Sequence, residues 1–87
     1  MSIEQTTVRV YVKPATDPCK QCDLTLDAFK KAGVPVIVED IYAEGNAEAA
    51  KALGLMSAPV VIAGDIQWAG FRPDLINELA ARIGATS

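Results

Sequence analysis

Residues 7–22 read TVRVYVKPATDPCKQC, and this stretch decides how the rest of the chain is interpreted. Its first six residues alternate and are rich in β-branched side chains, which predicts a strand over 7–12. A loop with two prolines follows at 13–18, and a helical period begins after it. The less polar face of that helix carries Cys22, Thr25, Leu26 and Phe29. Gly33 is a typical helix stop, so Cys19 and Cys22 are expected where a strand's loop enters a helix.

The next segments predict a strand and a second helix. Residues 34–39 are expected to form the strand, with Pro35 near its start, where a missing N–H is tolerated. Asn46 is expected to cap a helix that extends to Leu53, and Gly54 lies just past its end.

The last third of the chain predicts a hairpin and a final helix. Strands over 59–62 and 66–68 flank Gly64-Asp65, a pair that suits a tight type II′ turn. The final helix is expected to begin with Pro73 at its first position and to end near Gly84. Its core-facing residues are expected to be Leu75, Ile76, Leu79 and Ile83.

The predicted order is therefore β-α-β-α-β-β-α, an α/β arrangement. The first β-α-β is expected to be a right-handed parallel unit, whereas the hairpin must be antiparallel. A four-stranded mixed sheet flanked by three helices follows, which is the order of the thioredoxin/glutaredoxin fold. With 87 residues there is no room for a second core, so we expect one domain over 1–87.

Cys19 and Cys22 are the groups best suited to chemistry, because the chain has no histidine to serve as a general base or zinc ligand. A thiol at a helix N-terminus faces unsatisfied N–H groups and the positive end of the helix dipole, which lowers the pKa of Cys19. Lys20 adds a positive charge, whereas Asp17 and Asp23 oppose it. Cys22 lies one turn inward and should stay protonated longer. The asymmetry predicts that Cys19 attacks a target disulfide and that Cys22 resolves the mixed disulfide.

Charge and hydropathy exclude several classes of partner. The net charge is −3 and no dense Lys/Arg patch is present, which argues against nucleic acid or an anionic membrane. The longest apolar stretches are far too short to span a bilayer. The first residues lack the basic region and apolar core of a signal peptide, so we expect a cytoplasmic protein. In that compartment a CxxC pair more often serves redox chemistry than structure.

Two other interpretations of the cysteine pair remain open. The thiols could be inert, or they could bind a metal or a cluster together with a partner. Two sulfur ligands cannot complete a four-coordinate zinc or iron–sulfur site within one chain, so that site would need a dimer or an external thiol. The expected cofactor set is therefore empty apart from the redox-active disulfide, and no metal is expected.

Ala58-Pro59 is the second candidate feature. Only about 5–6% of X–Pro bonds are cis in folded proteins, so composition alone favours a trans bond at a strand edge. The expected position beside the cysteines favours cis instead. A cis bond would turn the backbone of Ala58 toward Cys19 and leave its N–H and C=O for an extended substrate strand.

Residues 68–74, which read WAGFRPD, form the third candidate feature. Trp68, Phe71 and Arg72 beside Gly70 could form a partner-binding surface. They could equally be the end of a strand followed by a helix cap, and the residue types alone do not decide between the two.

Taken together, these segments resemble the NrdH-redoxins, a family of glutaredoxin-like electron donors. The match covers Cys19-Lys20-Gln21-Cys22 with Thr25 three residues on, then APVVIAGD at 58–65, and spans 7 to about 83. Most specific is WAGFRPD at 68–74, which is similar to the family's Trp-Ser-Gly-Phe-Arg-Pro-Asp signature with Ala69 in place of serine. Lys20 and the proline-rich Asp17-Pro18 loop depart from the family pattern and bear on partner preference.

The resemblance implies a thiol–disulfide oxidoreductase that is reduced by thioredoxin reductase and reduces the large subunit of class Ib ribonucleotide reductase. NADPH and flavin would then act only through the partner reductase, and the chain would be a monomer. Partner contacts are expected from Lys20, Gln21, Ala58, Pro59, Trp68, Gly70, Phe71 and Arg72.

Two other functions compete with this one: a glutaredoxin that depends on glutathione or another low-molecular-weight thiol, and a dimeric iron–sulfur scaffold. Glutaredoxins hold the glutathione carboxylate at the start of their last helix, where free N–H groups attract anions. Here only Gly70 allows close approach to the backbone, and Pro73 removes an N–H from that position. We therefore expect poor glutathione binding, although Arg72 could restore some affinity for an anion.

Overall fold

The elements follow the predicted order β-α-β-α-β-β-α in a computed structural model that describes residues 7–43, 45–54 and 57–83. They are β1 (Val8–Val12), α1 (Lys20–Lys31), β2 (Ile37–Asp40), α2 (Asn46–Ala52), β3 (Val60–Ala63), β4 (Ile66–Ala69) and α3 (Pro73–Arg82).

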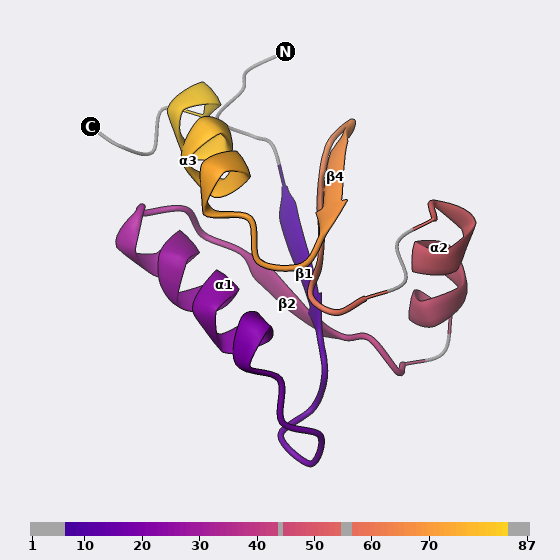
Figure 1. Cartoon of the computed structure of the whole chain (residues 1–87). Helices are drawn as coiled ribbons and strands as arrows, with labels where there is room; N and C mark the ends of the chain where they lie inside the picture. Colours follow the sequence, from indigo (N-terminus) through magenta and orange to yellow (C-terminus); the bar gives the residue numbers. More distant parts are fainter. Residues whose placement is uncertain (1–6, 44, 55–56, 84–87) are drawn as a thin grey trace.

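The four strands form one mixed sheet in the order β2-β1-β3-β4. β1 pairs in parallel with β2 and antiparallel with β3, and β3 pairs antiparallel with β4. Helices α1 and α3 lie on one side of this sheet and α2 lies on the other (Figure 1). The predicted α/β architecture, a four-stranded mixed sheet flanked by three helices, is confirmed.

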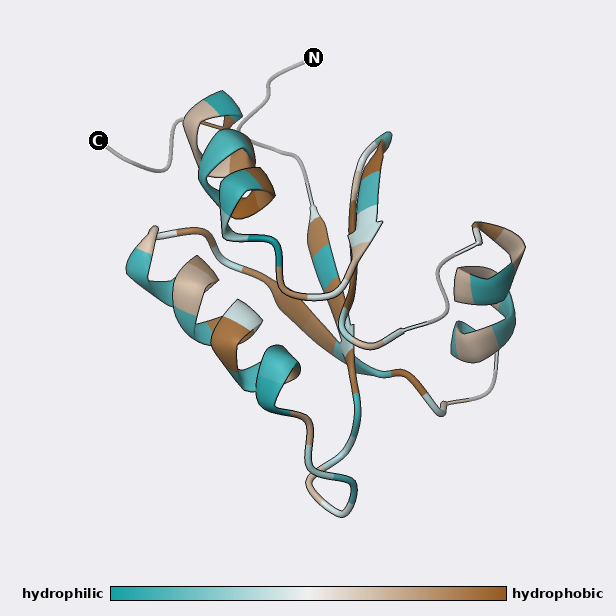
Figure 2. Cartoon of the chain, viewed as in Figure 1, coloured by the Kyte–Doolittle hydropathy of each residue, from teal (hydrophilic) through white to brown (hydrophobic). Residues whose placement is uncertain are grey.

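The main core lies between the sheet and the α1–α3 pair. Hydrophobic residues cluster along the strands, and hydrophilic residues cover the outward parts of both helices (Figure 2). At the centre, the rings of Phe29 and Trp68 stack with their centroids 6.4 Å apart. The other buried members are Val8, Val10, Val34, Val61, Ala63, Ile76, Leu79 and Ala80. This packing fixes the direction of α1, and therefore the position of the cysteines at its start.

A smaller cluster lies on the α2 side of the sheet. It consists of Ile41, Ala50 and Val60, with Tyr11, Ile62 and Ala69 partly buried against it. The edge strand β2 is less covered, since Ile37 and Val38 are exposed.

The second strand begins later than the sequence predicts. Val34 is buried in the main core, and its N–H donates to the carbonyl of Phe29 at the end of α1. Pairing with β1 starts only at Ile37, opposite Arg9. The predicted strand start at residue 34 is therefore wrong, because Val34 still belongs to the turn that closes α1.

The predicted cap of the second helix is also wrong. Gly45, with φ 87°, is the N-cap of α2, and Asn46 is its first helical residue. The Asn46 side chain instead donates to the carbonyl of Asp40 at 2.8 Å, which joins the helix to the end of β2.

The hairpin and the last helix agree with the prediction. Ala63 pairs with Ile66, so Gly64 and Asp65 form a two-residue turn. Pro73 is the first residue of α3, whose buried residues include Ile76 and Leu79, whereas the predicted end near Gly84 lies outside the described residues. Among 7–43, 45–54 and 57–83, no helix has the length and apolar character needed to cross a membrane.

Candidate active site

Cys19 and Cys22 form a disulfide at the start of α1, with their Cα atoms 5.3 Å apart. Cys19 is the N-cap residue of the helix, and its backbone is extended. Its Sγ accepts a hydrogen bond from the backbone N–H of Cys22 at 3.2 Å. A free N–H of the first turn therefore points at this sulfur, which favours a thiolate there once the disulfide is reduced.

The two cysteines differ in exposure. Cys19 is half-buried, whereas Cys22 is only 2% exposed. Thr25 lies one turn further along the same face and is fully buried. Its Oγ1 has no hydrogen-bond partner within the part of the chain that the structure describes.

The Ala58–Pro59 peptide bond is cis, which confirms the prediction made from its position. Pro59 is buried and Ala58 is half-buried. The Pro59 carbonyl accepts a hydrogen bond of 2.8 Å from the N–H of Gly70, so the start of β3 is held against the end of β4.

Gln21 connects the cysteine turn to the segment before α3. Its Oε1 accepts a hydrogen bond from the N–H of Phe71 at 3.4 Å. A Cβ added at Gly70 would lie 3.5 Å from the same oxygen, and Gly70 has φ 87°, which side chains rarely adopt. Both observations place residues 70–71 directly beside the CxxC turn, a proximity that their separation in the sequence does not predict.

The other expected partner contacts lie in different environments. Lys20 and Arg72 are exposed and Phe71 is half-buried. Trp68 is only 4% exposed and stacks on Phe29. The expectation that Trp68 itself touches a partner does not fit this burial, because its ring supports the loop from within the core. The residue types left both interpretations of this segment open, because tryptophan is common both in cores and at interfaces.

Arg72 and Asp74 form a two-pronged ion pair at the start of α3. Arg72 Nε and one Nη lie 3.2 and 3.0 Å from the two carboxylate oxygens. The hydrogen bonds from Arg72 hold the pKa of Asp74 below its usual value. The charged groups at this helix start are therefore already engaged with each other.

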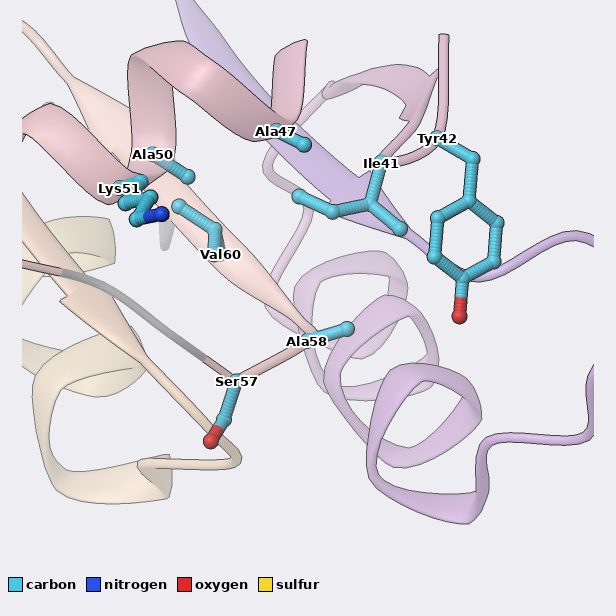
Figure 3. Close-up of a pocket in the computed structure, with 8 residues that line it drawn as sticks. All are labelled: Ile41, Tyr42, Ala47, Ala50, Lys51, Ser57, Ala58 and Val60. Atoms are coloured by element: carbon cyan, nitrogen blue, oxygen red, sulfur yellow. The ribbon is translucent and has the colours of Figure 1, made fainter.

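Two cavities flank the site. One, of about 420 Å³, lies between α1 and the loop that precedes it. Its lining residues are Val12, Lys13, Pro14, Ala15, Pro18, Cys19, Cys22, Asp23 and Leu26. The other, of about 220 Å³, lies between α2 and the segment that leads into β3, and Ala58 forms part of its wall (Figure 3).

A hydrogen bond joins the loops next to these cavities. The Tyr42 hydroxyl after β2 donates to Asp17 Oδ2 in the loop before Cys19. Nothing in the sequence predicts this contact, because the two residues are 25 positions apart and neither belongs to a motif.

The described residues hold no group of three or more His, Cys, Asp or Glu side chains that could bind a metal ion. The geometry at the start of α1 supports thiol–disulfide exchange. A half-buried sulfur lies at the helix end, where a disulfide can approach it, and a second sulfur lies buried one turn away.

Known proteins share this arrangement, although no family model matches the chain. The chain is 48% identical over 74 residues to the glutaredoxin-like protein NrdH of Escherichia coli K12, covering 83% of this chain and 89% of that protein. The solved structure of the Escherichia coli NrdH-redoxin superimposes with a TM-score of 0.76 and 38% identity, covering 84% and 93% of the two chains. A glutaredoxin from Archaeoglobus fulgidus superimposes with a TM-score of 0.66 and 27% identity, covering 86% of each.

Proposed function

The chain belongs to the NrdH glutaredoxin-like proteins, which are thiol–disulfide oxidoreductases, and we propose that it carries electrons from thioredoxin reductase to class Ib ribonucleotide reductase. The Escherichia coli NrdH-redoxin, which shares this fold, has a thioredoxin-like activity profile. In our proposal the chain acts in the cytoplasm as a monomeric, single-domain carrier.

The two cysteines take different roles in this cycle. The Cys19 thiolate attacks one sulfur of the target disulfide, and the other target sulfur leaves as a thiolate that takes a proton from solvent. Cys22 then attacks Cys19, which releases the second target thiol and forms the Cys19–Cys22 disulfide. The exposure of Cys19, its place at the N-cap and the burial of Cys22 all support this order. NADPH, through the flavin of the reductase, returns two electrons to the disulfide.

The partner is proposed to bind across the surface next to Cys19. The contact residues lie in the CxxC turn, at the cis-proline and before α3; they are Lys20, Gln21, Ala58, Pro59, Gly70, Phe71 and Arg72. The hydrogen bonds from Gly70 to Pro59 and from Phe71 to Gln21 hold these three segments together. In this arrangement Trp68 supports the surface from the core.

One observation supports the choice of reductant: polar groups at the start of α3 are already bonded to other residues of the chain. Gln21 accepts the Phe71 N–H that an incoming carboxylate would need, and Arg72 is paired with Asp74. Pro73 offers no N–H at the first helical position. Glutathione therefore has fewer free backbone donors for its carboxylate at this helix start, which supports reduction by a protein.

The test is coupled turnover of NADPH in two reconstituted systems. One contains thioredoxin reductase, this chain and class Ib ribonucleotide reductase, with deoxyribonucleotide as the product measured. The other contains glutathione and glutathione reductase in place of thioredoxin reductase. A glutathione-dependent glutaredoxin serves as the positive control for the second system, and Cys19→Ser serves as the inactive control for both.

We expect rapid NADPH oxidation and deoxyribonucleotide formation in the first system and little in the second. Equal or faster turnover with glutathione would move the chain to the glutathione-dependent class. Reduction of the disulfide by thioredoxin reductase without formation of deoxyribonucleotide would support the proposed reductase and contradict the proposed electron acceptor.

A further inference from the structure

The cavity beside α1 gives Cys22 its own polar surroundings. Both cysteines line it, together with two charged side chains, Lys13 from the loop after β1 and Asp23 from the first turn of α1. The remaining lining residues are uncharged. Cys22 is 2% exposed, whereas Asp23, the next residue, is exposed and lines the same cavity.

The chemistry requires a proton acceptor near Cys22. A thiol attacks a disulfide only as a thiolate, and burial disfavours that charged form. A nearby group that accepts the proton of Cys22 as it attacks Cys19 would therefore speed the step at neutral pH, and the chain has no histidine to serve as that group.

We infer that Asp23 accepts the proton of Cys22 when the mixed disulfide is resolved, across the cavity that both residues line. The inference rests on the proposed role of Cys22 as the resolving thiol. Lys13, the other charged residue that lines the cavity, is paired with Asp17 at 3.9 Å, which leaves Asp23 as the carboxylate in that lining.

The Asp23 carboxylate takes the proton from Cys22, and the Cys22 sulfur bonds to Cys19 Sγ. The bond between Cys19 and the substrate sulfur breaks, and the substrate leaves as a thiolate that recovers a proton from Asp23 or from solvent. Two electrons pass from the protein thiols to the substrate disulfide. When the protein is reduced again, the departing Cys22 thiolate takes up a proton from solvent, directly or through Asp23.

The other charged groups nearby are engaged elsewhere or do not line the cavity. Asp17 pairs with Lys13 at 3.9 Å and accepts the Tyr42 hydroxyl. Lys20, in the CxxC turn, is exposed and does not line the cavity. The start of β3, across from the cysteine turn, carries Pro59, Val60 and Val61, and none of them is charged. Arg72 and Asp74, at the start of α3, pair with each other.

The proposal predicts that Asp23→Asn slows the resolving step, whereas a simple charge effect would speed it. A carboxylate near a thiol disfavours the thiolate, so Asp23→Asn should lower the pKa of Cys22. If Asp23 acted only through its charge, this substitution would speed the resolving step. If Asp23 accepts the proton, the substitution slows that step even though the pKa of Cys22 falls.

The experiment is stopped-flow reaction of the reduced protein with Ellman's reagent, an aromatic disulfide that needs no protein partner. The first release of coloured thiolate reports attack by the nucleophile, and the second reports resolution. Both rates are measured as a function of pH for the wild type, Asp23→Asn and Asp27→Asn. Asp27 is the matched control, since it lies one turn further along α1, is exposed and pairs with Lys31 at 3.0 Å. The pKa of Cys22 is measured separately by thiolate absorbance in Cys19→Ser, with and without Asp23→Asn.

We expect Asp23→Asn to slow the second release roughly 10- to 100-fold near neutral pH, at or below the lower end of the range of general-base effects. The loss should shrink at high pH, where solvent removes the proton, and Asp27→Asn should behave like the wild type. A second release that is unchanged or faster in Asp23→Asn overturns the inference, and so does an equal loss in Asp27→Asn. If Cys22→Ser gives both releases and Cys19→Ser neither, the proposed role of Cys22 fails instead.

Discussion

The Tyr42 hydroxyl donates a hydrogen bond of 2.5 Å to Asp17 Oδ2, which ties the loop after β2 to the loop that delivers Cys19 to α1. Asp17 is also bonded within its own loop, since its N–H donates to the carbonyl of Pro14. Tyr42 lines the cavity in Figure 3, whereas Pro14 lines the cavity beside the cysteines. These two bonds together therefore connect the walls of both cavities next to the active site.

Tyr42→Phe should loosen the loop before Cys19 while leaving the fold intact, because it removes only the hydroxyl of an exposed side chain. We expect faster amide hydrogen exchange over residues 13–18, measured by mass spectrometry on the oxidised protein. Exchange in the β3–β4 hairpin, which Tyr42 does not contact, serves as the internal control. Unchanged exchange over 13–18 would show that Pro14 and the local turn hold the loop by themselves.

The same bond makes the ionisation of Tyr42 a reporter of Asp17. The hydrogen bond to Asp17 raises the pKa of Tyr42 above its ordinary value of 10.0, with smaller contributions from desolvation and from the negative charges of Asp17 and Asp40. Because the folded pKa is raised, the stabilisation is fully present below pH 10 and is lost as the pH rises through the folded pKa. Asp17→Asn should lower the pKa of Tyr42, measured by phenolate absorbance in a Tyr11→Phe background.

Asp65→Asn, at the tip of the β3–β4 hairpin, is the matched control for the loss of a negative charge. An equal fall in the pKa of Tyr42 in both variants would mean that net charge, rather than the hydrogen bond, sets the shift.

The sequence predicted the order of elements because that order depends on local signals. Alternation gave β1, helical period gave α1, and Gly64-Asp65 gave the hairpin. The two errors arose where tertiary contacts override local preference. Val34 is drawn into the core rather than into the sheet, and Asn46 bonds to the end of β2 rather than capping its own helix.

For the active site, the sequence predicted the cysteine pair and the cis peptide bond, since both follow from position in the fold. It did not predict the bonds from Phe71 to Gln21 or from Tyr42 to Asp17. Each joins segments that are far apart in the chain and depends on how the loops fold back over the sheet. The burial of Trp68 could not be decided from the sequence for a different reason, because an aromatic residue in a motif suits a core and a surface equally well.

Phe29→Ala tests whether the stacked pair beneath the site holds the fold together. Phe29 is fully buried against Trp68, so the substitution should lower the free energy of unfolding by about 3–5 kcal/mol in urea denaturation of the oxidised protein. Leu24→Ala, on the exposed side of the same helix, should cost about 1 kcal/mol or less. Equal losses in the two variants would contradict a core centred on Phe29. If Phe29→Ala does not fold, Phe29→Leu gives a smaller loss to compare.

Thr25→Val should leave the stability unchanged or raise it by up to about 1 kcal/mol, since a buried hydroxyl without a partner costs free energy. Valine has a similar shape and helix propensity, so the main change is the loss of the hydroxyl. Urea denaturation measures the effect, with Thr25→Ala as the control that also removes the methyl group. A loss of stability in Thr25→Val comparable with that in Thr25→Ala would show that the hydroxyl has a bonding role in solution.

The division of labour between the cysteines can be tested by trapping. Cys19 is the half-buried N-cap of α1, whereas Cys22 is buried one turn inward. Cys22→Ser should therefore attack a protein disulfide through Cys19 and stop there, because no second thiol is present to release the substrate. Cys19→Ser should remain almost entirely unreacted, because its one thiol is shielded from a macromolecular disulfide. Mass spectrometry under non-reducing conditions would show the covalent adduct in the first variant and free protein in the second. An adduct through Cys22 in the Cys19→Ser variant, formed at the rate seen for Cys22→Ser, would mean that burial does not select the nucleophile.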